Sequence, residues 1–142
     1  MLLILKCYRL IIFSIIAQII FPASVVSAQT KATWKAPPAS SELKNPFAND
    51  KTVTTEGKTL YTANCAPCHG SKGKGNGPAA AALNPKPADH TSKVVQDETD
   101  GSLYWKISEG HKPMPQYKTA FSDKQRWALV NFIRTLSTTS KK

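Results

Sequence analysis

Hydrophobic residues recur with a helical period near the end of the chain. Four of them share the spacing i, i+3, i+4, i+7 that places side chains on one face of an α-helix: Leu129, Phe132, Ile133 and Leu136. Just ahead of them, Ser122 and Gln125 fit a capping box, in which each side chain binds the backbone amide of the other residue. We therefore predict a helix over residues 123–137.

Two more helices are indicated earlier in the chain. Residues 56–68 are predicted to form one, with Thr55 as its N-cap, and residues 101–109 a shorter one, capped by Asp100 and ended by Gly110. No useful run of alternating hydrophobic and polar residues is present, so the pattern predicts an all-α fold.

The long connection between these two helices, residues 70–99, carries four of the seven glycines and three of the ten prolines. It has no hydrophobic period and is longer than the usual connections within a compact domain. Connections of this kind commonly have a function, and we expect this one to wrap around something that is not protein.

The beginning of the chain has the organisation of an export signal. Lys6 and Arg9 precede an apolar run over residues 10–21, and the small residues at 26–28 fit a cleavage site. We therefore expect residues 1–28 to be a signal peptide. An uncleaved membrane anchor is the alternative.

The following segment, residues 29–54, mixes Pro, Ser, Thr, Asn and Lys without an apolar period, and we expect a flexible leader. Trp34 and Phe47 within it could pack on the domain or on a partner.

The folded domain is then residues 55–137, followed by a basic tail at 138–142. A core of this size commonly needs a metal, a disulfide or a cofactor.

The overall charge is strongly positive, with 19 Lys and Arg against 9 Asp and Glu and a formal net charge of +10. Because the chain is expected to be exported, has few arginines and does not interleave aromatic with basic residues, we expect no nucleic-acid partner. Its three cysteines exclude a dense disulfide framework.

The chemistry is concentrated in residues 65–69, Cys-Ala-Pro-Cys-His, which match the C-x-x-C-H signature of covalent haem attachment. Two thiols three residues apart on a helical turn can reach both vinyl groups on one edge of a porphyrin and form thioethers. The histidine that follows can then bind the iron. The motif predicts one haem c attached through Cys65 and Cys68, with His69 as an iron ligand.

The motif is compatible with three other kinds of site. A thioredoxin-like redox pair would need a βαβ pattern, which the sequence lacks. A zinc site would need further ligands, and His90 and His111 are the remaining histidines. A simple disulfide between Cys65 and Cys68 would leave His69 and the long connection unexplained. We interpret His90 as a solvated loop residue.

Met114 is the candidate for the sixth ligand of the iron. It is the only methionine besides the initiator, and Pro113 and Pro115 on either side hold its backbone extended. A thioether is a soft ligand that raises the reduction potential relative to two imidazoles. Two alternatives stay open, namely a methionine that fills a gap in the core and His111 as the sixth ligand.

The folded part resembles the class I c-type cytochromes, in particular small bacterial monohaem ones. The resemblance covers residues 56–137 and rests on these matches: Gly57, Tyr61, C-A-P-C-H-G at 65–70, G-N-G-P at 75–78, M-P-Q-Y at 114–117 and W-A-L-V-N-F-I-R-T-L at 127–136. It implies a small cytochrome c-like fold, with helices wrapped around one covalently bound haem and long irregular loops.

The resemblance also implies roles for individual residues. Cys65 and Cys68 would be the thioether donors, with His69 as the proximal ligand and Met114 as the distal one. Pro78 would be the proline whose backbone carbonyl accepts a hydrogen bond from the ligating histidine.

Other residues receive packing roles. Gly57 and Tyr61 would lie where the first helix crosses the last one, near Leu129 and Phe132. Three aromatic residues would be either haem contacts or ordinary core residues: Tyr104, Trp105 and Tyr117.

The function implied is that of a periplasmic one-electron carrier, because iron with histidine and methionine ligands leaves no position open for a substrate. The chain would not be an enzyme, although it could be a subunit of an oxidoreductase complex. A haem enzyme such as a peroxidase would need a labile sixth position. Membrane attachment is expected only if residues 1–28 are retained.

The lysines expected to border the haem would steer the protein towards acidic patches on redox partners, such as a quinol-oxidising complex, a dehydrogenase or a terminal oxidase. A surface that is basic for solubility alone is the other explanation. These lysines are Lys58, Lys72, Lys74, Lys86, Lys112 and Lys118.

Overall fold

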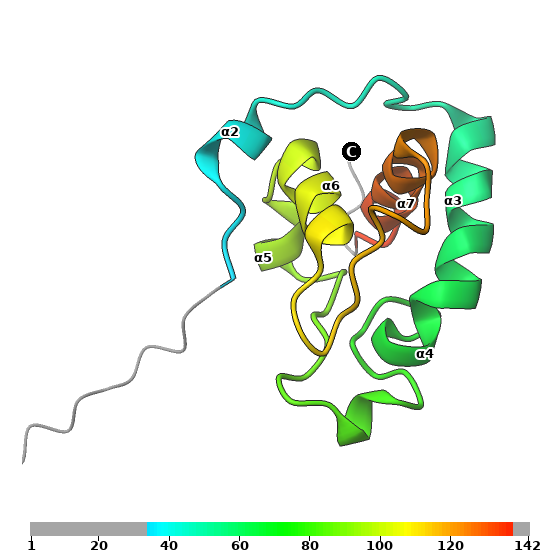
Figure 1. Ribbon diagram of the computed structural model, residues 1–142. Coiled ribbons are helices and arrows are strands. Elements are labelled where there is room, and N and C mark those ends of the chain that lie inside the picture. The colour runs from blue at the N-terminus through cyan, green and yellow to red at the C-terminus, as the bar shows by residue number, and fades with distance from the viewer. Residues whose placement is uncertain (1–33, 138–142) are drawn as a thin grey trace, which may run out of the picture. The chain divides into compact units, whose positions relative to one another are not determined.

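The computed structural model describes residues 34–137. Its helical elements are α2 (Pro38–Ser41), α3 (Lys51–Asn64), α4 (Ala66–His69), the 3-10 turn η1 (Ala80–Ala82), α5 (Lys93–Gln96), α6 (Asp100–Glu109) and α7 (Asp123–Thr135). Within this range the backbone contains an isolated bridge but no strand, which confirms the all-α expectation (Figure 1). None of these helices is long and apolar enough to cross a bilayer.

The expected signal peptide and basic tail lie outside the described residues.

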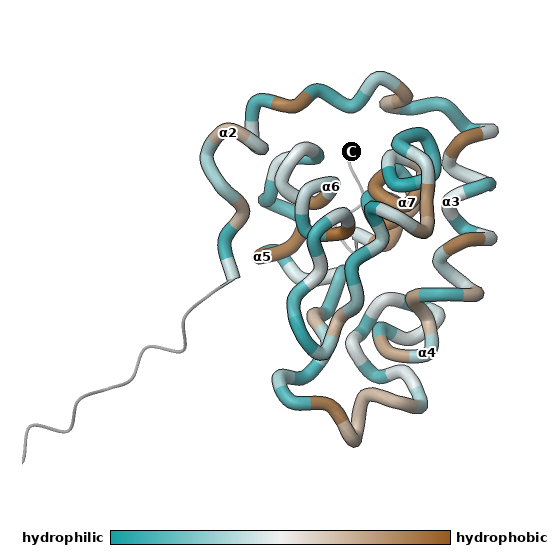
Figure 2. The backbone as a smooth tube through the Cα atoms, viewed as in Figure 1, coloured by the Kyte–Doolittle hydropathy of each residue, from teal (hydrophilic) through white to brown (hydrophobic). Residues whose placement is uncertain are grey.

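The centre of the fold is the crossing of α3 and α7 (Figure 1). Hydrophobic residues recur along both helices (Figure 2). Gly57 lies against the backbone of Ala128, where an added methyl group would overlap the carbonyl oxygen. One turn further on, the buried ring of Tyr61 packs on Phe132 with 5.0 Å between centroids. The expected crossing is therefore confirmed, and the glycine permits it.

The helix α7 begins as the sequence predicts. The Ser122 hydroxyl accepts a hydrogen bond from the Gln125 amide, and the Gln125 side chain accepts one from the Ser122 amide. The helix ends at Thr135, two residues before the predicted end.

The predicted helix over residues 56–68 is in fact two helices. The first, α3, starts earlier than expected because the Asp50 carboxylate accepts hydrogen bonds from the amides of Thr52 (2.8 Å) and Val53 (3.0 Å). It stops at Asn64, and Pro67 then lies in the first turn of α4, where its missing amide hydrogen costs nothing.

The helix α6 has Thr99 as its N-cap rather than Asp100. The Thr99 hydroxyl accepts a hydrogen bond from the Ser102 amide at 3.1 Å. Asp100 is instead the first helical residue, and its carboxylate pairs with Arg134 at 2.8 Å. Gly110 ends the helix with a φ of +66°, as expected of a residue without a side chain.

The expectation that residues 29–54 form a flexible leader is wrong for the residues that the structure describes, 34–54. Residues 34–50 fold against the domain, and α2 lies beside α6 (Figure 1). The carbonyl of the buried Ser40 sits directly over Gly101, where no Cβ would fit. The leader was predicted from its polar composition, but some of its polar side chains, such as Asn45, bind the domain.

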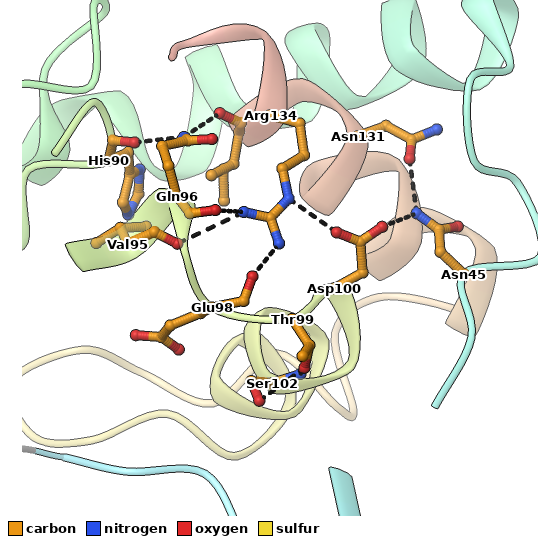
Figure 3. A network of polar contacts seen from close by, with 11 residues as sticks. Asn45, His90, Val95, Gln96, Glu98, Thr99, Asp100, Ser102, Asn131 and Arg134 are labelled. Atoms are coloured by element: carbon orange, nitrogen blue, oxygen red, sulfur yellow. Dashed lines mark hydrogen bonds and ion pairs between the residues drawn. The ribbon is translucent and has the colours of Figure 1, made fainter. Parts of the chain in front are cut away.

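Asn45 shows how these polar groups are used. Its side-chain amide donates to Asn131 of α7 at 2.8 Å and to Asp100 at 3.1 Å (Figure 3). Asn131 in turn donates to the carbonyl of Phe47 at 2.7 Å. The segment is thereby fixed to both α6 and α7.

Arg134 joins the end of α7 to the chain between α5 and α6 (Figure 3). Besides Asp100, its guanidinium donates to the carbonyl oxygens of Gln96 (2.9 Å) and Glu98. The Gln96 side chain donates to the carbonyl of His90 at 2.6 Å. The network therefore holds the end of the long connection, where residue 90 lies, against the helical core.

Candidate cofactor site

The C-x-x-C-H motif folds as one helical turn that follows α3 directly. The amides of Cys68 and His69 donate to the carbonyl of Cys65 at 3.1 and 2.8 Å. Both cysteines are half-buried free thiols. The turn thus presents two thiols and an imidazole from one short stretch, which is the donor set that a covalently attached haem requires.

The thiol of Cys65 is strongly shielded from water. Burial, and after it the neighbouring Cys68, raises the pKa of Cys65 to about 12, so the thiol is protonated near neutral pH. Within residues 34–137, no group of three or more His, Cys, Asp or Glu side chains is placed to hold a metal ion. The geometry therefore gives no support to the zinc alternative.

His69 has the environment of a metal ligand. It is 8% exposed, and its Nδ1 lies 3.0 Å from the carbonyl oxygen of Ala88, to which it donates. Burial is the main effect on the pKa of His69 and lowers it, which favours the neutral imidazole. With Nδ1 carrying the proton, Nε2 keeps a lone pair free for iron.

The carbonyl that holds His69 was assigned to Pro78 from the resemblance, and this assignment is wrong. Pro78 is exposed, and Ala88 occupies the accepting position. The reason is the path of the loop: the Gly77 amide donates to the Cys68 carbonyl at 3.0 Å, so this stretch folds back on the outside of α4.

His90 is packed behind the candidate ligand rather than solvated, which corrects the sequence-based interpretation. Its ring is stacked on that of His69 with 4.1 Å between centroids and 17° between planes. Its Nδ1 is 3.1 Å from the hydroxyl of Tyr61. Burial, and after it the nearby His69, lowers the pKa of His90 to about 3. The side chain is thereby kept neutral, and it packs on the core residue Tyr61 with 5.7 Å between ring centroids.

Met114 lies in a tight turn instead of an extended stretch. His111 and Met114 exchange two backbone hydrogen bonds, of 3.0 and 2.8 Å, and Pro113 between them follows a cis peptide bond. Gly110 closes the base of this turn against the backbone of Pro115, with no room for a Cβ. The Met114 side chain is half-buried.

Tyr117 brings the segment that carries Met114 next to the cysteines. Its hydroxyl donates to the carbonyl of Asn64 at 3.3 Å. Burial, followed by the nearby thiols of Cys65 and Cys68, raises the pKa of Tyr117 to about 12. Of the three aromatic residues considered in the sequence, this is the one placed at the motif.

The other two aromatic residues pack elsewhere. Tyr104 stacks on Trp127, with 4.1 Å between centroids, and donates to Asp123 at 2.9 Å. Trp105 faces Trp34 of the N-terminal segment, with 6.1 Å between centroids. The lysines singled out in the sequence are exposed.

Comparison with known proteins points to the same cofactor. The family model for cytochrome c matches residues 54–137. No curated protein matches the chain. A solved chain from the reducing HAO-like protein complex of Kuenenia stuttgartiensis is similar, with a TM-score of 0.60 and 28% sequence identity over 69% of this chain and 49% of that one. This chain thus spans about half the length of that relative. It belongs to the cytochrome c family, in which covalently bound haem transfers electrons.

Proposed function

We propose that the protein carries single electrons on one haem c, attached through Cys65 and Cys68 and ligated by His69 and Met114. The observation that carries this proposal is the environment of His69: the ring is buried and oriented by the Ala88 carbonyl, directly after two free thiols.

The residues of the chain would prepare the site for electron transfer. The hydrogen bond from His69 to Ala88 fixes the imidazole and increases its basicity as a ligand. The buried core beside it, including Tyr61 and Phe132, keeps water away. When bound, haem c would supply an iron that alternates between the ferric and ferrous states. With two protein ligands, the iron would have no coordination position open for a substrate. Because packed elements hold both ligands, the structural reorganisation between the two oxidation states would be small.

The identity of the sixth ligand is tested by Met114→Ala in the haem-loaded protein. We expect loss of the near-infrared methionine-to-iron(III) band and a lower midpoint potential, because a soft thioether favours reduced iron. Gln116→Ala, at an exposed neighbouring position, is the matched control and should keep both. A midpoint potential that is unchanged in Met114→Ala and shifts in His111→Gln would assign the ligand to His111.

We also propose that the protein is exported to the periplasm and freed by cleavage near residue 28. The basic residues Lys6 and Arg9, the apolar run that follows them and the small residues at 26–28 support this. Acidic surfaces on electron donors and acceptors would be its partners, because of its high positive charge. Recovery of the uncleaved chain in washed membranes would contradict cleavage and favour the anchor.

A second candidate is a fixed subunit of a larger redox assembly. It is favoured by the structural neighbour, which is part of a protein complex and about twice as long as the matched region. Size-exclusion chromatography of a gentle native extract separates the two. A free carrier would elute at its own mass, and a subunit would elute with its partners.

A further inference from the structure

We infer that the N-terminal segment, residues 34–50, is a brace for the turn that carries Met114, and that Trp34 is the positioning residue through which it acts. Trp34 packs on His111, the paired residue on the other arm of the turn. It thereby keeps the turn closed and holds the His111 imidazole in a stack, away from the iron. The inference rests on the proposed function only in taking Met114 as the sixth ligand.

The first observation is the set of contacts around Trp34. Its ring is stacked on His111, with 5.1 Å between centroids and 27° between planes. It also faces Trp105 of α6 at 6.1 Å, and the ammonium group of Lys106 lies 5.4 Å from its centroid. Lys106 is itself held by Glu98 at 2.5 Å. The indole is therefore placed between α6 and the turn.

The second observation is the connection from His111 to Met114. The two residues exchange a pair of backbone hydrogen bonds, so neither arm can move without opening the other. His111 itself is exposed, and within residues 34–137 Trp34 is the one aromatic ring that stacks on it. Loss of that stack would free an imidazole three residues from the candidate ligand.

The third observation is that the other end of the segment is firmly anchored. The Ser40 carbonyl fills the space above Gly101, and Asn45 bonds to Asn131. A tethered segment can hold Trp34 in position at a lower entropic cost than a free one. The family match begins at residue 54, so the brace lies outside the part of the chain that the family model covers.

The contact should have a measurable effect on opening of the turn. An aromatic pair of this kind changes an equilibrium by about two- to tenfold. Opening exposes the amides of His111 and Met114 to solvent exchange, and in the haem-loaded protein it permits an added ligand to replace the thioether.

The test compares Trp34→Ala with Trp34→Phe, which keeps an aromatic face, and with Leu43→Ala as the control. Leu43 belongs to the same segment, is 44% exposed and lies away from the turn at the Gly101 end. Two quantities are measured in the haem-loaded full chain: hydrogen exchange of the His111 and Met114 amides, and the rate at which added imidazole displaces the sixth ligand. We expect both to rise about two- to tenfold in Trp34→Ala, less in Trp34→Phe, and not in Leu43→Ala.

A double variant, Trp34→Ala with His111→Gln, checks the second part of the inference. If the freed His111 competes for iron, Trp34→Ala will show a fraction of bis-histidine spectrum that disappears in the double variant. If that fraction is absent, His111 does not compete and this part is wrong. Should Trp34→Ala fail to fold, Trp34→Leu takes its place in all comparisons.

Failure of the inference can be told apart from failure of the proposed function. If the wild-type protein shows the methionine band, and exchange and displacement in the Trp34 variants equal those of Leu43→Ala, there is no brace. If the wild type lacks the band, Met114 is not the ligand, and amide exchange at the turn alone then decides whether Trp34 braces it.

Discussion

At the scale of single residues, His69 is held by contacts on two sides. Its Nδ1 donates to the Ala88 carbonyl, and one face of its ring lies on His90. His90 is positioned in turn by the hydroxyl of Tyr61 and by a hydrogen bond from its amide to the Gly73 carbonyl at 2.7 Å. The orientation of the candidate ligand thus depends on residues from α3 and from both ends of the long connection.

Replacement of His90 tests this arrangement. We expect His90→Ala in the haem-loaded protein to lower the free energy of unfolding by about 1–3 kcal/mol, because a stacked ring and a partly buried hydrogen bond are lost. His90→Phe keeps an aromatic ring, so its free energy of unfolding should fall by less. Denaturant unfolding measures both, with the exposed Lys72→Ala as control, expected to change by less than about 0.5 kcal/mol. Equal stability of His90→Ala and the control would show that the stack contributes nothing.

The sequence predicts the cysteines and His69 as the haem-binding residues, but it does not show which groups hold His69 in place. A C-x-x-C-H motif is visible because it needs particular side chains at fixed spacing. The acceptor at Ala88 is a backbone carbonyl, which any residue possesses, so nothing in the sequence marks it. His90 lies among prolines and polar residues that resemble a solvated loop, and only closure of that loop buries it.

At the scale of elements, the crossing of α3 and α7 depends on a close backbone approach. Gly57 is the point of contact, and its neighbours on α7 are Ala128 and Leu129. The buried side chains of Tyr61, Leu129 and Val130 fill the crossing on either side.

A methyl group at the crossing should separate the two helices. We expect Gly57→Ala to lower the free energy of unfolding by about 1–3 kcal/mol, since the clash involves the backbone carbonyl of Ala128, which cannot move aside as a side chain would. Thermal or denaturant unfolding measures the change. Lys58→Ala, the next residue and an exposed one, should stay within about 0.5 kcal/mol of the wild type. A Gly57→Ala protein as stable as Lys58→Ala would contradict the close crossing.

The strongly periodic elements were predictable, and the others were not. The last helix has both a regular apolar face and a capping box, which are local signals. The short helices α2 and α5 span four residues each, too few to show a period. The N-terminal segment is held by distant partners such as Gly101 and Asn131, so its composition alone indicated a flexible chain.

At the scale of the whole molecule, the positive charge should govern encounters with redox partners. Lys72 is exposed and lies just after His69 in the loop that folds back on α4. Lys51 begins α3 at the end opposite to the cysteines. The two positions separate a local effect near the site from an effect of net charge.

Electron exchange with small inorganic complexes measures this field without a biological partner. We expect oxidation by ferricyanide, an anion, to slow as ionic strength rises, and oxidation by a cationic cobalt complex to quicken. Lys72→Gln should slow the ferricyanide reaction by about two- to fivefold at low salt, and Lys51→Gln by less. Equal effects of the two substitutions would favour a surface that is basic only for solubility.

The central claim is that a haem is bonded to this chain through both thiols. It is tested most directly by the mass of the purified protein, made from the full gene with haem-maturation machinery and measured after denaturation and acid–solvent extraction. The account predicts the polypeptide mass plus one haem, with the added mass located on the peptide that contains Cys65 and Cys68 and absent from the Cys65→Ser/Cys68→Ser variant. A polypeptide mass alone, with all haem released into the solvent, would contradict it.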